Sequence, residues 1–253
     1  MKLIKQNDSA GGLIFKQNNN GKAMKQNYNF GKAFKFSGSI RASSDFSHLM
    51  TNGFSFLVWG RNWQGSSNAN SFFTLTFDNT IIVEFSPRGN PSFSLQLRIR
   101  DPILGTINNF NVGPHENTSF LAGLVNNTVL YNNNKSPVWS GGALPDNYFI
   151  GKTLTKVSFP NAQLSGLIND IIIYDRNITD AEISYFFNNK LGNEELNDLG
   201  LIAKYKNDAA TIVDNSVVIK NYAGVENLEL LNLPAGTLEE QRDYANDNLF
   251  ETW

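Results

Sequence analysis

Apolar and polar residues alternate with a period of two at many places in the chain, and this pattern constrains the fold more than any other feature. In residues 92–101, the clearest case, the apolar positions are Phe93, Leu95, Leu97 and Ile99. The positions between them are Ser94, Gln96, Arg98 and Arg100. Because successive side chains of a strand point to opposite faces, we expect a strand with Leu97 in a core and Gln96 on a water-exposed face.

Several further segments show the same pattern and are separated by turn residues. Strands are expected at residues 34–36, 54–59, 71–77, 80–86, 92–101, 124–131, 148–152 and 167–174. The pairs Asp78-Asn79 and Asn126-Asn127 are typical of tight hairpins. The 36 asparagines and 20 glycines favour turns, and the 19 phenylalanines favour strands. Many short strands with turns between them predict an all-β antiparallel sandwich or jelly roll.

Only two helices are expected, and each begins with a capping box. In the first, Thr179 stands three residues before Glu182, and apolar residues follow at helical spacing up to Gly192. In the second, Thr237 stands three residues before Glu240. The chain therefore predicts one short helix after the last strand of the sandwich and a helix near its carboxyl end.

Four segments, taken in order, resemble laminin-G-like, or concanavalin A-like, jelly-roll domains. SGLINDIIIYDRNITDAEISYFFN, at residues 165–188, resembles the last strand and the helix that closes such a domain. GKAFKFSGS at 31–39, GFSFLVWGRNW at 53–63 and GGALPDNYFIGK at 141–152 resemble segments that precede it. The resemblance covers about residues 31–190 and implies a jelly roll there. The family's aromatic-His pair and Asn-Gly turn are replaced here by His115 and three asparagines at 132–134.

The two ends of the chain differ from this domain in composition. Residues 1–30 are poor in apolar side chains, so we expect an arm that attaches the protein or joins subunits. Residues 191–253 are expected to be an acidic extension with the terminal helix. The net charge is +6 over residues 1–35 and −8 over residues 191–253, which favours a homo-oligomer in which the ends meet. The segment 199–250 resembles a terminal segment of structural proteins of Bacteroides-infecting gut phages, including crAss-like phages.

Nothing in the sequence points to catalysis, and no catalytic residue is predicted. The chain has no cysteine, so a thiolate nucleophile is excluded. His48 and His115 are far apart in the sequence and lack the context of a triad. Asp170 and Asp175 are five residues apart, so one strand would place them on opposite faces. No metal site or cofactor is predicted, although the resemblance leaves Ca²⁺ open.

A sugar-binding site is the ligand site for which the sequence offers candidate residues. Such sites combine an aromatic platform with amide and guanidinium donors, and the chain offers these in two groups. The candidate ligand-binding residues are Arg61, Asn62, Trp63, Asn133 and Trp139. The alternative for both tryptophans is a place in the core or in a subunit interface. Trp59, which continues an alternating run, is expected in the core.

The resemblance implies a non-enzymatic virion protein, a head or tail fibre component of a bacteriophage that displays a lectin-like jelly roll. Its expected partners are other virion proteins, further copies of the chain and host-surface glycans. Two alternatives stay open: a stand-alone carbohydrate-binding adhesin and a polysaccharide-active glycoside hydrolase. The basic amino-terminal segment, residues 1–35, lacks the arginines and stacking aromatics of a nucleic-acid site, so no nucleic acid is expected as a partner. No apolar run is long enough to span a membrane, and residues 1–10 lack an apolar signal-peptide core.

Overall fold

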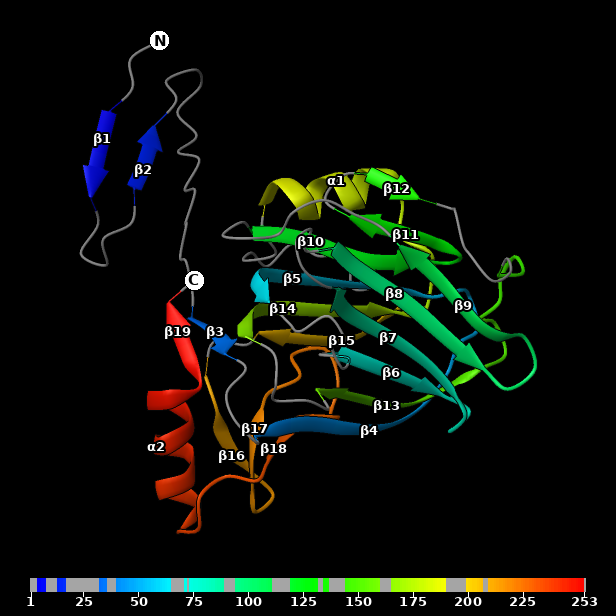
Figure 1. The fold of residues 1–253 in the computed structure, drawn as a ribbon. Coiled ribbons are helices and arrows are strands. Elements are labelled where there is room, and N and C mark those ends of the chain that lie inside the picture. Colours follow the sequence, from blue (N-terminus) through cyan, green and yellow to red (C-terminus); the bar gives the residue numbers. More distant parts are fainter. Residues whose placement is uncertain are drawn as a thin grey trace.

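The main body of the protein, seen in a computed structural model, is a sandwich of two antiparallel β-sheets (Figure 1). The structure describes residues 4–7, 13–16, 32–35, 40–64, 71, 73–88, 94–110, 119–131, 134–136, 144–159, 165–189, 199–206 and 209–252. One sheet has nine strands and the other has eight among these residues. The sequence-based prediction of an all-β jelly-roll sandwich with two short helices is therefore confirmed.

The nine-stranded sheet has the spatial order β16-β17-β18-β4-β13-β6-β7-β8-β9. Its strands are β4 (Arg41–Leu49), β6 (Phe73–Phe77), β7 (Ile81–Arg88), β8 (Ser94–Asp101), β9 (Gly105–Phe110), β13 (Thr153–Phe159), β16 (Thr211–Val213), β17 (Ser216–Ile219) and β18 (Leu228–Leu231). Strand β13 lies between β4 and β6, which precede it by many residues. Such long connections distinguish a jelly roll from a simple meander.

The eight-stranded sheet packs behind the first. Its order is β12-β11-β10-β5-β14-β3-β19, with β15 also paired to β14. Its strands are β3 (Lys32–Lys35), β5 (Ser55–Gln64), β10 (Ser119–Val125), β11 (Thr128–Tyr131), β12 (Asn134–Ser136), β14 (Ser165–Tyr174), β15 (Leu201–Lys206) and β19 (Phe250–Thr252). Strands β1 (Ile4–Asn7) and β2 (Leu13–Lys16) pair with each other in a sheet of their own.

Asparagine and aspartate hold the tight turns of the hairpins. Asp78 and Asn79 join β6 to β7 with φ angles of 49° and 58°, and Asn126 has a φ of 54° between β10 and β11. These are the two hairpins that the sequence predicted. Asp214 and Asn215 form a third turn of this kind, between β16 and β17. Positive φ at both central residues, as in the turns at 78–79 and 214–215, matches the twist of the paired strands, and Asn and Asp tolerate it best after glycine.

Helix α1 (Asp180–Asn189) begins with the capping box expected from the sequence. The amide of Thr179 donates to the Glu182 carboxylate at 2.8 Å, and the amide of Glu182 donates back to the Thr179 hydroxyl at 3.3 Å. Arg176 donates two hydrogen bonds to the same carboxylate. These bonds, the Arg176 pair first, lower the pKa of Glu182 to about 2, so the helix start stays anchored by a charged group.

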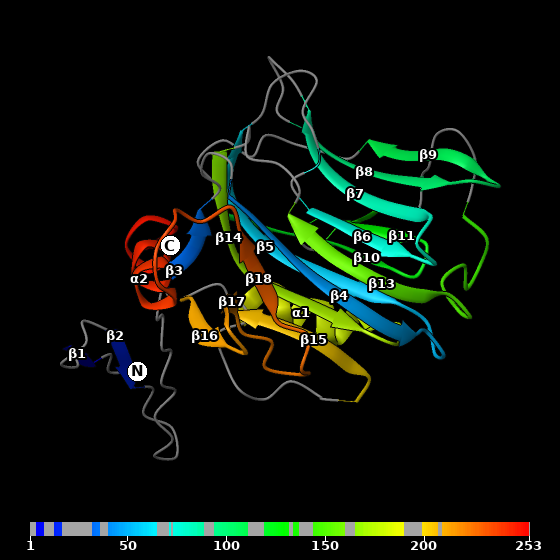
Figure 2. The ribbon, with the colours of Figure 1, turned by 90° about the horizontal axis from the view of Figure 1, so that it is seen from below.

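Helix α2 (Leu238–Asn248) also begins with its expected capping box, formed by Thr237 and Glu240. It lies at the end of the sandwich where β3 and β19 meet, opposite the β8–β9 hairpin (Figures 1 and 2). Among the described residues, neither helix is long and apolar enough to cross a membrane.

Phenylalanine rings fill the space between the two sheets. The largest fully buried side chains include Phe34, Phe54, Phe56, Phe73, Phe77, Phe85, Phe120 and Phe149. Phe56 of one sheet meets Phe85 of the other edge to face, with ring centroids 4.8 Å apart, which is a preferred aromatic geometry. A second apolar cluster lies on the outer side of the eight-stranded sheet and includes Ile183 and Phe186 of α1 together with Trp59 of β5. The sandwich thus has one main core and a smaller one under α1.

Residues 148–152 do not form the strand expected from their alternation. Asn147 and Gly151 have φ angles of 56° and 83°, and Ile150 donates its amide to the carbonyl of Asn147. The segment is a series of turns whose Phe149 ring points into the core. Its apolar residues reflect burial of a turn, which period-two counting cannot distinguish from a short strand.

Residues 201–252 contribute five strands that the sequence expectations do not include. Strand β18 pairs with β4, β15 pairs with β14, and β19 pairs with β3. Lys35 of β3 also forms an ion pair with Glu251 of β19. A basic residue near the front therefore meets an acidic residue near the tail within one chain.

Asp175 ties the carboxyl end of β14 to the turn between β4 and β5. Its carboxylate accepts hydrogen bonds from the amide of Thr51 at 2.6 Å, the hydroxyl of Thr51 at 2.9 Å and the amide of Asn52 at 3.2 Å. The His48 Nε2 atom lies 3.4 Å away. Burial alone would raise the pKa of Asp175, but these bonds together hold it below its usual value.

We expect Asp175→Asn to lower the free energy of unfolding by about 1 to 3 kcal/mol at pH 7, because the amide loses one acceptor and the charge. Since the folded-state pKa is lowered, the carboxylate stabilises the fold above the unfolded pKa and loses this effect as the pH falls through the folded one. The difference in free energy of unfolding between the unmodified protein and Asp175→Asn should therefore be smaller near pH 3 than at pH 7. Urea unfolding at both pH values tests this, with the exposed Asp243→Asn as control. A gap that stays constant with pH would contradict it.

Candidate functional site

The structure describes the candidate sugar-binding residues only in part. Arg61 lies in β5, where it pairs with Ser119 of β10 and Leu167 of β14. Asn62 and Trp63 follow it in the same strand. Asn133 and Trp139 lie outside the described residues, as do the side chains of Asn62 and Trp63. The proposed grouping of these five residues therefore stays a prediction.

Trp59 occupies the buried position that the sequence predicted for it. Its side chain is 3% exposed and stacks on Phe187 of α1, with ring centroids 6.3 Å apart. It therefore packs α1 against the sheet and is not a platform for a ligand.

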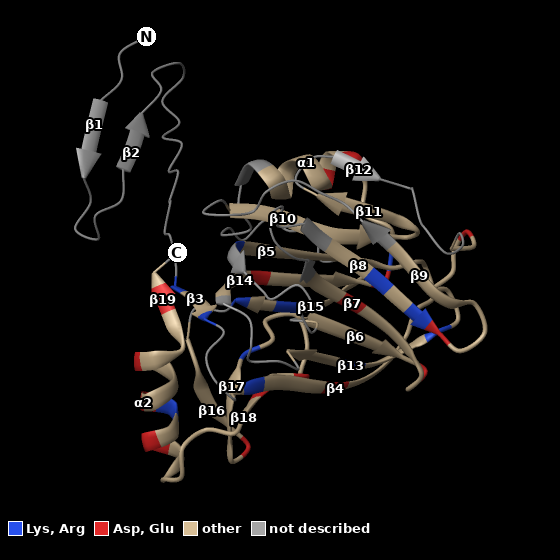
Figure 3. Cartoon of the chain, viewed as in Figure 1, with Lys and Arg blue, Asp and Glu red and all other residues tan. Residues whose placement is uncertain are grey.

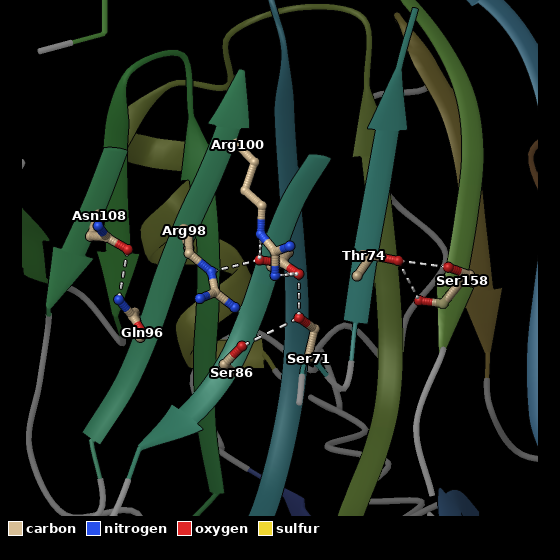
Figure 4. A network of polar contacts seen from close by, with 9 residues as sticks. Ser71, Thr74, Ser86, Gln96, Arg98, Arg100, Asn108 and Ser158 are labelled. Atoms are coloured by element: carbon tan, nitrogen blue, oxygen red, sulfur yellow. Dashed lines mark hydrogen bonds and ion pairs between the residues drawn. The ribbon is translucent and has the colours of Figure 1, made fainter. Parts of the chain in front are cut away.

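A row of polar residues crosses the outer face of the nine-stranded sheet. Directly paired residues of antiparallel strands share one face, so the register identifies the members of the row. In strand order from β18 to β9 they are Glu229, Ser43, Ser158, Thr74, Glu84, Arg98 and Asn108. Ser86, Gln96 and Arg100 lie beside it on the same side of β7 and β8 (Figure 4). We call these ten residues the polar face.

Glu84 is the centre of the polar face. It is 5% exposed, and its carboxylate accepts hydrogen bonds from Arg98 Nε at 2.6 Å, from Arg100 at 2.9 and 2.8 Å and from the Ser71 hydroxyl at 2.8 Å. A buried carboxylate is stable only when it is paired and hydrogen-bonded in this way. Since Arg100 binds through two nitrogens, its guanidinium is held in a fixed orientation above the sheet (Figure 4).

Two further pairs extend the polar face on either side of Glu84. Gln96 donates to Asn108 at 2.8 Å, and the hydroxyls of Thr74 and Ser158 lie 2.6 Å apart. Gln96 is only 1% exposed, so the prediction that it faces water is wrong. The alternation correctly places it on the outer face, but its amide is buried there by a hydrogen-bonded network.

The exposed members of the polar face present hydrogen-bonding groups to the solvent. The Arg100 side chain is 50% exposed, and Asn108, Ser158 and Ser43 are partly exposed. Guanidinium, amide and hydroxyl groups are the donors and acceptors that hydroxyl-rich ligands require. The buried members fix the backbone and side chains beneath them, so the exposed groups are oriented before a ligand arrives.

No group of three His, Asp or Glu side chains that could hold a metal ion occurs among the residues that the structure describes. The carboxylate at the centre of the polar face, Glu84, is occupied by two guanidinium groups. The Glu84 carboxylate neutralises part of the charge of Arg98 and Arg100 and fixes the orientation of their guanidinium groups.

Sequence reasoning missed the polar face as a candidate site, although it assigned Arg98 and Arg100 to the outward side of their strand. The available signal was an acidic residue, Glu84, on the strand that pairs with them. Register between strands cannot be read from one strand alone, so this signal appears only once the hairpin is aligned.

The sequence matches no protein-family model and no curated protein. Among solved structures, the chain is similar to "a putative carbohydrate binding protein" from Bacteroides ovatus, with a TM-score of 0.54 and 14% identity over 83% of this chain. The match spans 60% of that structure's length. This similarity shows a shared fold.

Two further solved structures have lower TM-scores. A native heptameric SAP-like pentraxin from Limulus polyphemus has a TM-score of 0.45 and 12% identity, over 62% of this chain and 82% of that one. The binding domain of Botulinum Neurotoxin DC, solved in complex with SialylT, has a TM-score of 0.42 and 12% identity, over 87% of this chain and 61% of that one. The strand order and the similarity to the Bacteroides ovatus structure show that the fold of this protein is a jelly-roll sandwich.

Proposed function

We propose that this protein is a non-catalytic, lectin-like module that binds carbohydrate through the polar face. The observation that carries the proposal is the continuous row of polar side chains across seven paired strands, with Glu84 orienting two arginines at its centre. The Bacteroides ovatus structure, which is similar in fold and described as "a putative carbohydrate binding protein", supports it.

A glycan array probed with the full chain tests this function. For a glycan that the unmodified chain binds on the array, Arg100→Met and Asn108→Ala should each weaken binding by about tenfold. Each substitution removes a hydrogen-bond donor from the polar face. Arg242→Met is the matched control, because Arg242 is an exposed arginine on α2 that pairs with Asp243. Equal binding by all three variants would show that the polar face is not the site.

Reducing-sugar release separates binding from hydrolysis. The full chain should leave any glycan that it binds on the array intact. The Glu84 carboxylate is hydrogen-bonded to two arginines and a serine, so it is not available as a general acid or base. Release of reducing ends that stops in Glu84→Gln would replace the binding proposal with a glycoside hydrolase.

We further propose that the module is displayed on a bacteriophage particle, as a fibre-type component that joins other virion proteins and further copies of itself. The resemblance of residues 199–250 to phage structural proteins supports this role, and a stand-alone adhesin is its alternative. Mass spectrometry and immunogold labelling of purified particles test it. Detection of the protein on cell surfaces but not on particles would favour the adhesin.

Deletion of residues 2–28 tests the proposed arm. We expect the truncated chain to keep its thermal stability, because β3 and all strands of the two large sheets follow the deletion. It should no longer form its native oligomer, as measured by light scattering. A melting temperature lowered by more than about 10 °C would show that the arm contributes to the sandwich.

A further inference from the structure

A second polar site lies on the opposite side of the sandwich, at β15. A pocket of about 300 Å³ is lined there by Leu201, Lys204, Lys206, Tyr222 and Ala223. Lys204 and Lys206 alternate with Ala203 and Tyr205, which face the main core, so the lysines point outward from the eight-stranded sheet. Figure 3 shows these basic residues along β15.

The pocket wall is fixed by hydrogen bonds from the loop that follows β17. The amide of Tyr222 donates to the carbonyl of Lys204 at 2.8 Å. The buried Asn221 side chain accepts from the amides of Lys204 and Ala223, both at 2.9 Å. Residues 221–223 therefore run along the edge of β15 in a defined position, and the Tyr222 ring stays beside the lysines.

Tyr222 gathers positive charge at the mouth of the pocket. Its side chain is 54% exposed, and the ammonium groups of Lys206 and Lys220 lie 5.4 and 5.6 Å from its ring centroid. Cations at this distance are attracted by the electrons of the ring. Among the described residues, no ion pair includes Lys206 or Lys220.

Among the residues that the structure describes, two carboxylates, Asp170 and Glu226, lie near this cluster and are fewer than its lysines. Asp170 is opposite Lys206 in the register of β14 and β15 and is buried. Glu226 accepts a hydrogen bond from the amide of Val225. Even if both were counted in full against the three lysines, the described residues would give the pocket a positive charge that attracts an anion.

We propose that this pocket binds a sugar acid, a pyranose ring that carries a carboxylate. The lysines would pair with the carboxylate, and the exposed Tyr222 would contact the ring and donate its hydroxyl. A volume of about 300 Å³ lies at the lower end of the range for small-ligand sites, which suits one sugar residue. The sugar in this inference rests on the proposed carbohydrate-binding function, but the site lies apart from the polar face.

Titration of the full chain with glucuronic acid and with glucose tests the inference, because these sugars differ only in the oxidation of C6. Chemical-shift changes in NMR spectra report the binding. Glucuronic acid should bind at least about tenfold more tightly than glucose, and its affinity should fall when salt is raised from about 0.05 M to about 0.5 M. Acetate should bind more weakly than glucuronic acid, because it lacks the ring. Acetate or inorganic phosphate binding as tightly would overturn the sugar part of the proposal.

Three variants locate the site. Lys220→Met and Tyr222→Ala should each weaken glucuronic acid binding by about fivefold to tenfold. Lys156→Met, which removes an exposed lysine of β13 on the other sheet, should leave it unchanged. Thermal melts check that each variant is folded. Unchanged affinity in folded Lys220→Met and Tyr222→Ala would overturn the assignment of this pocket.

The same titration distinguishes failure of this inference from failure of the proposed function. Loss of neutral-glycan binding in Arg100→Met with normal glucuronic acid binding supports two separate sites. Glucuronic acid binding that depends on Arg100 and not on Tyr222 overturns the pocket while leaving the polar face in place. Pocket-dependent glucuronic acid binding in a chain that retains no glycan on the array supports the pocket and contradicts the polar face as a sugar site.

Discussion

Leu97→Asp should prevent the sandwich from folding at room temperature. Leu97 is 1% exposed and belongs to the core between the two sheets. Burying an unpaired carboxylate there costs several kcal/mol, which is comparable with the whole free energy of unfolding of a domain. Circular dichroism and urea unfolding measure the loss, and near-native stability would show that β8 has a different register.

The matched control for Leu97→Asp is Thr106→Asp. Thr106 is exposed on β9 and lies opposite Arg100, so a new carboxylate there would meet a guanidinium and remain in water. We expect its melting temperature to change little. Gln96→Asp should be destabilising, although less than Leu97→Asp, because the buried amide would be lost from its bond to Asn108.

Glu84→Leu should be the most damaging substitution on the outer face. It would leave the partly buried Arg98 without its carboxylate, and removing one partner of a buried ion pair costs about 3 to 5 kcal/mol. Adding Arg98→Met should recover part of this loss, because two apolar side chains can then pack where two charges stood. Urea unfolding of the single and double variants measures the recovery.

Glu229→Leu is the control for Glu84→Leu. Glu229 belongs to the same polar row but is exposed and bonds to the Ser216 hydroxyl at 3.0 Å. Its replacement should change the free energy of unfolding by less than about 1 kcal/mol. A similar loss in both variants would show that the row contributes uniformly and that Glu84 has no central role.

The parts of the fold that the sequence predicted are those set by neighbouring residues. Asp78-Asn79 adopts its turn because these two residues accept positive φ, and Thr179 caps α1 through a bond to a residue three positions away. The burial of Leu97 could be predicted because it follows from alternation along one strand, which is a local pattern. Each of these features depends on fewer than about ten consecutive residues.

The features that the sequence did not predict depend on distant residues. Strand β18 exists because β4, nearly two hundred residues earlier, offers it an edge, as the pairing of Glu229 with Ser43 shows. Gln96 is buried because the outer network forms around it, so its exposure could not be inferred from its own strand. The polar face likewise needs the register of seven strands before its members can be named.

The pairing of β3 with β19 has a consequence for synthesis of the protein. The ion pair between Lys35 and Glu251 joins residues 216 positions apart, and β19 is made after every other strand of the two sheets. Until it leaves the ribosome, the backbone edge of β3 that it covers remains open to other chains. This edge of a nascent chain is therefore vulnerable to cross-pairing until β19 has emerged, and factors that shield strand edges would act in that interval.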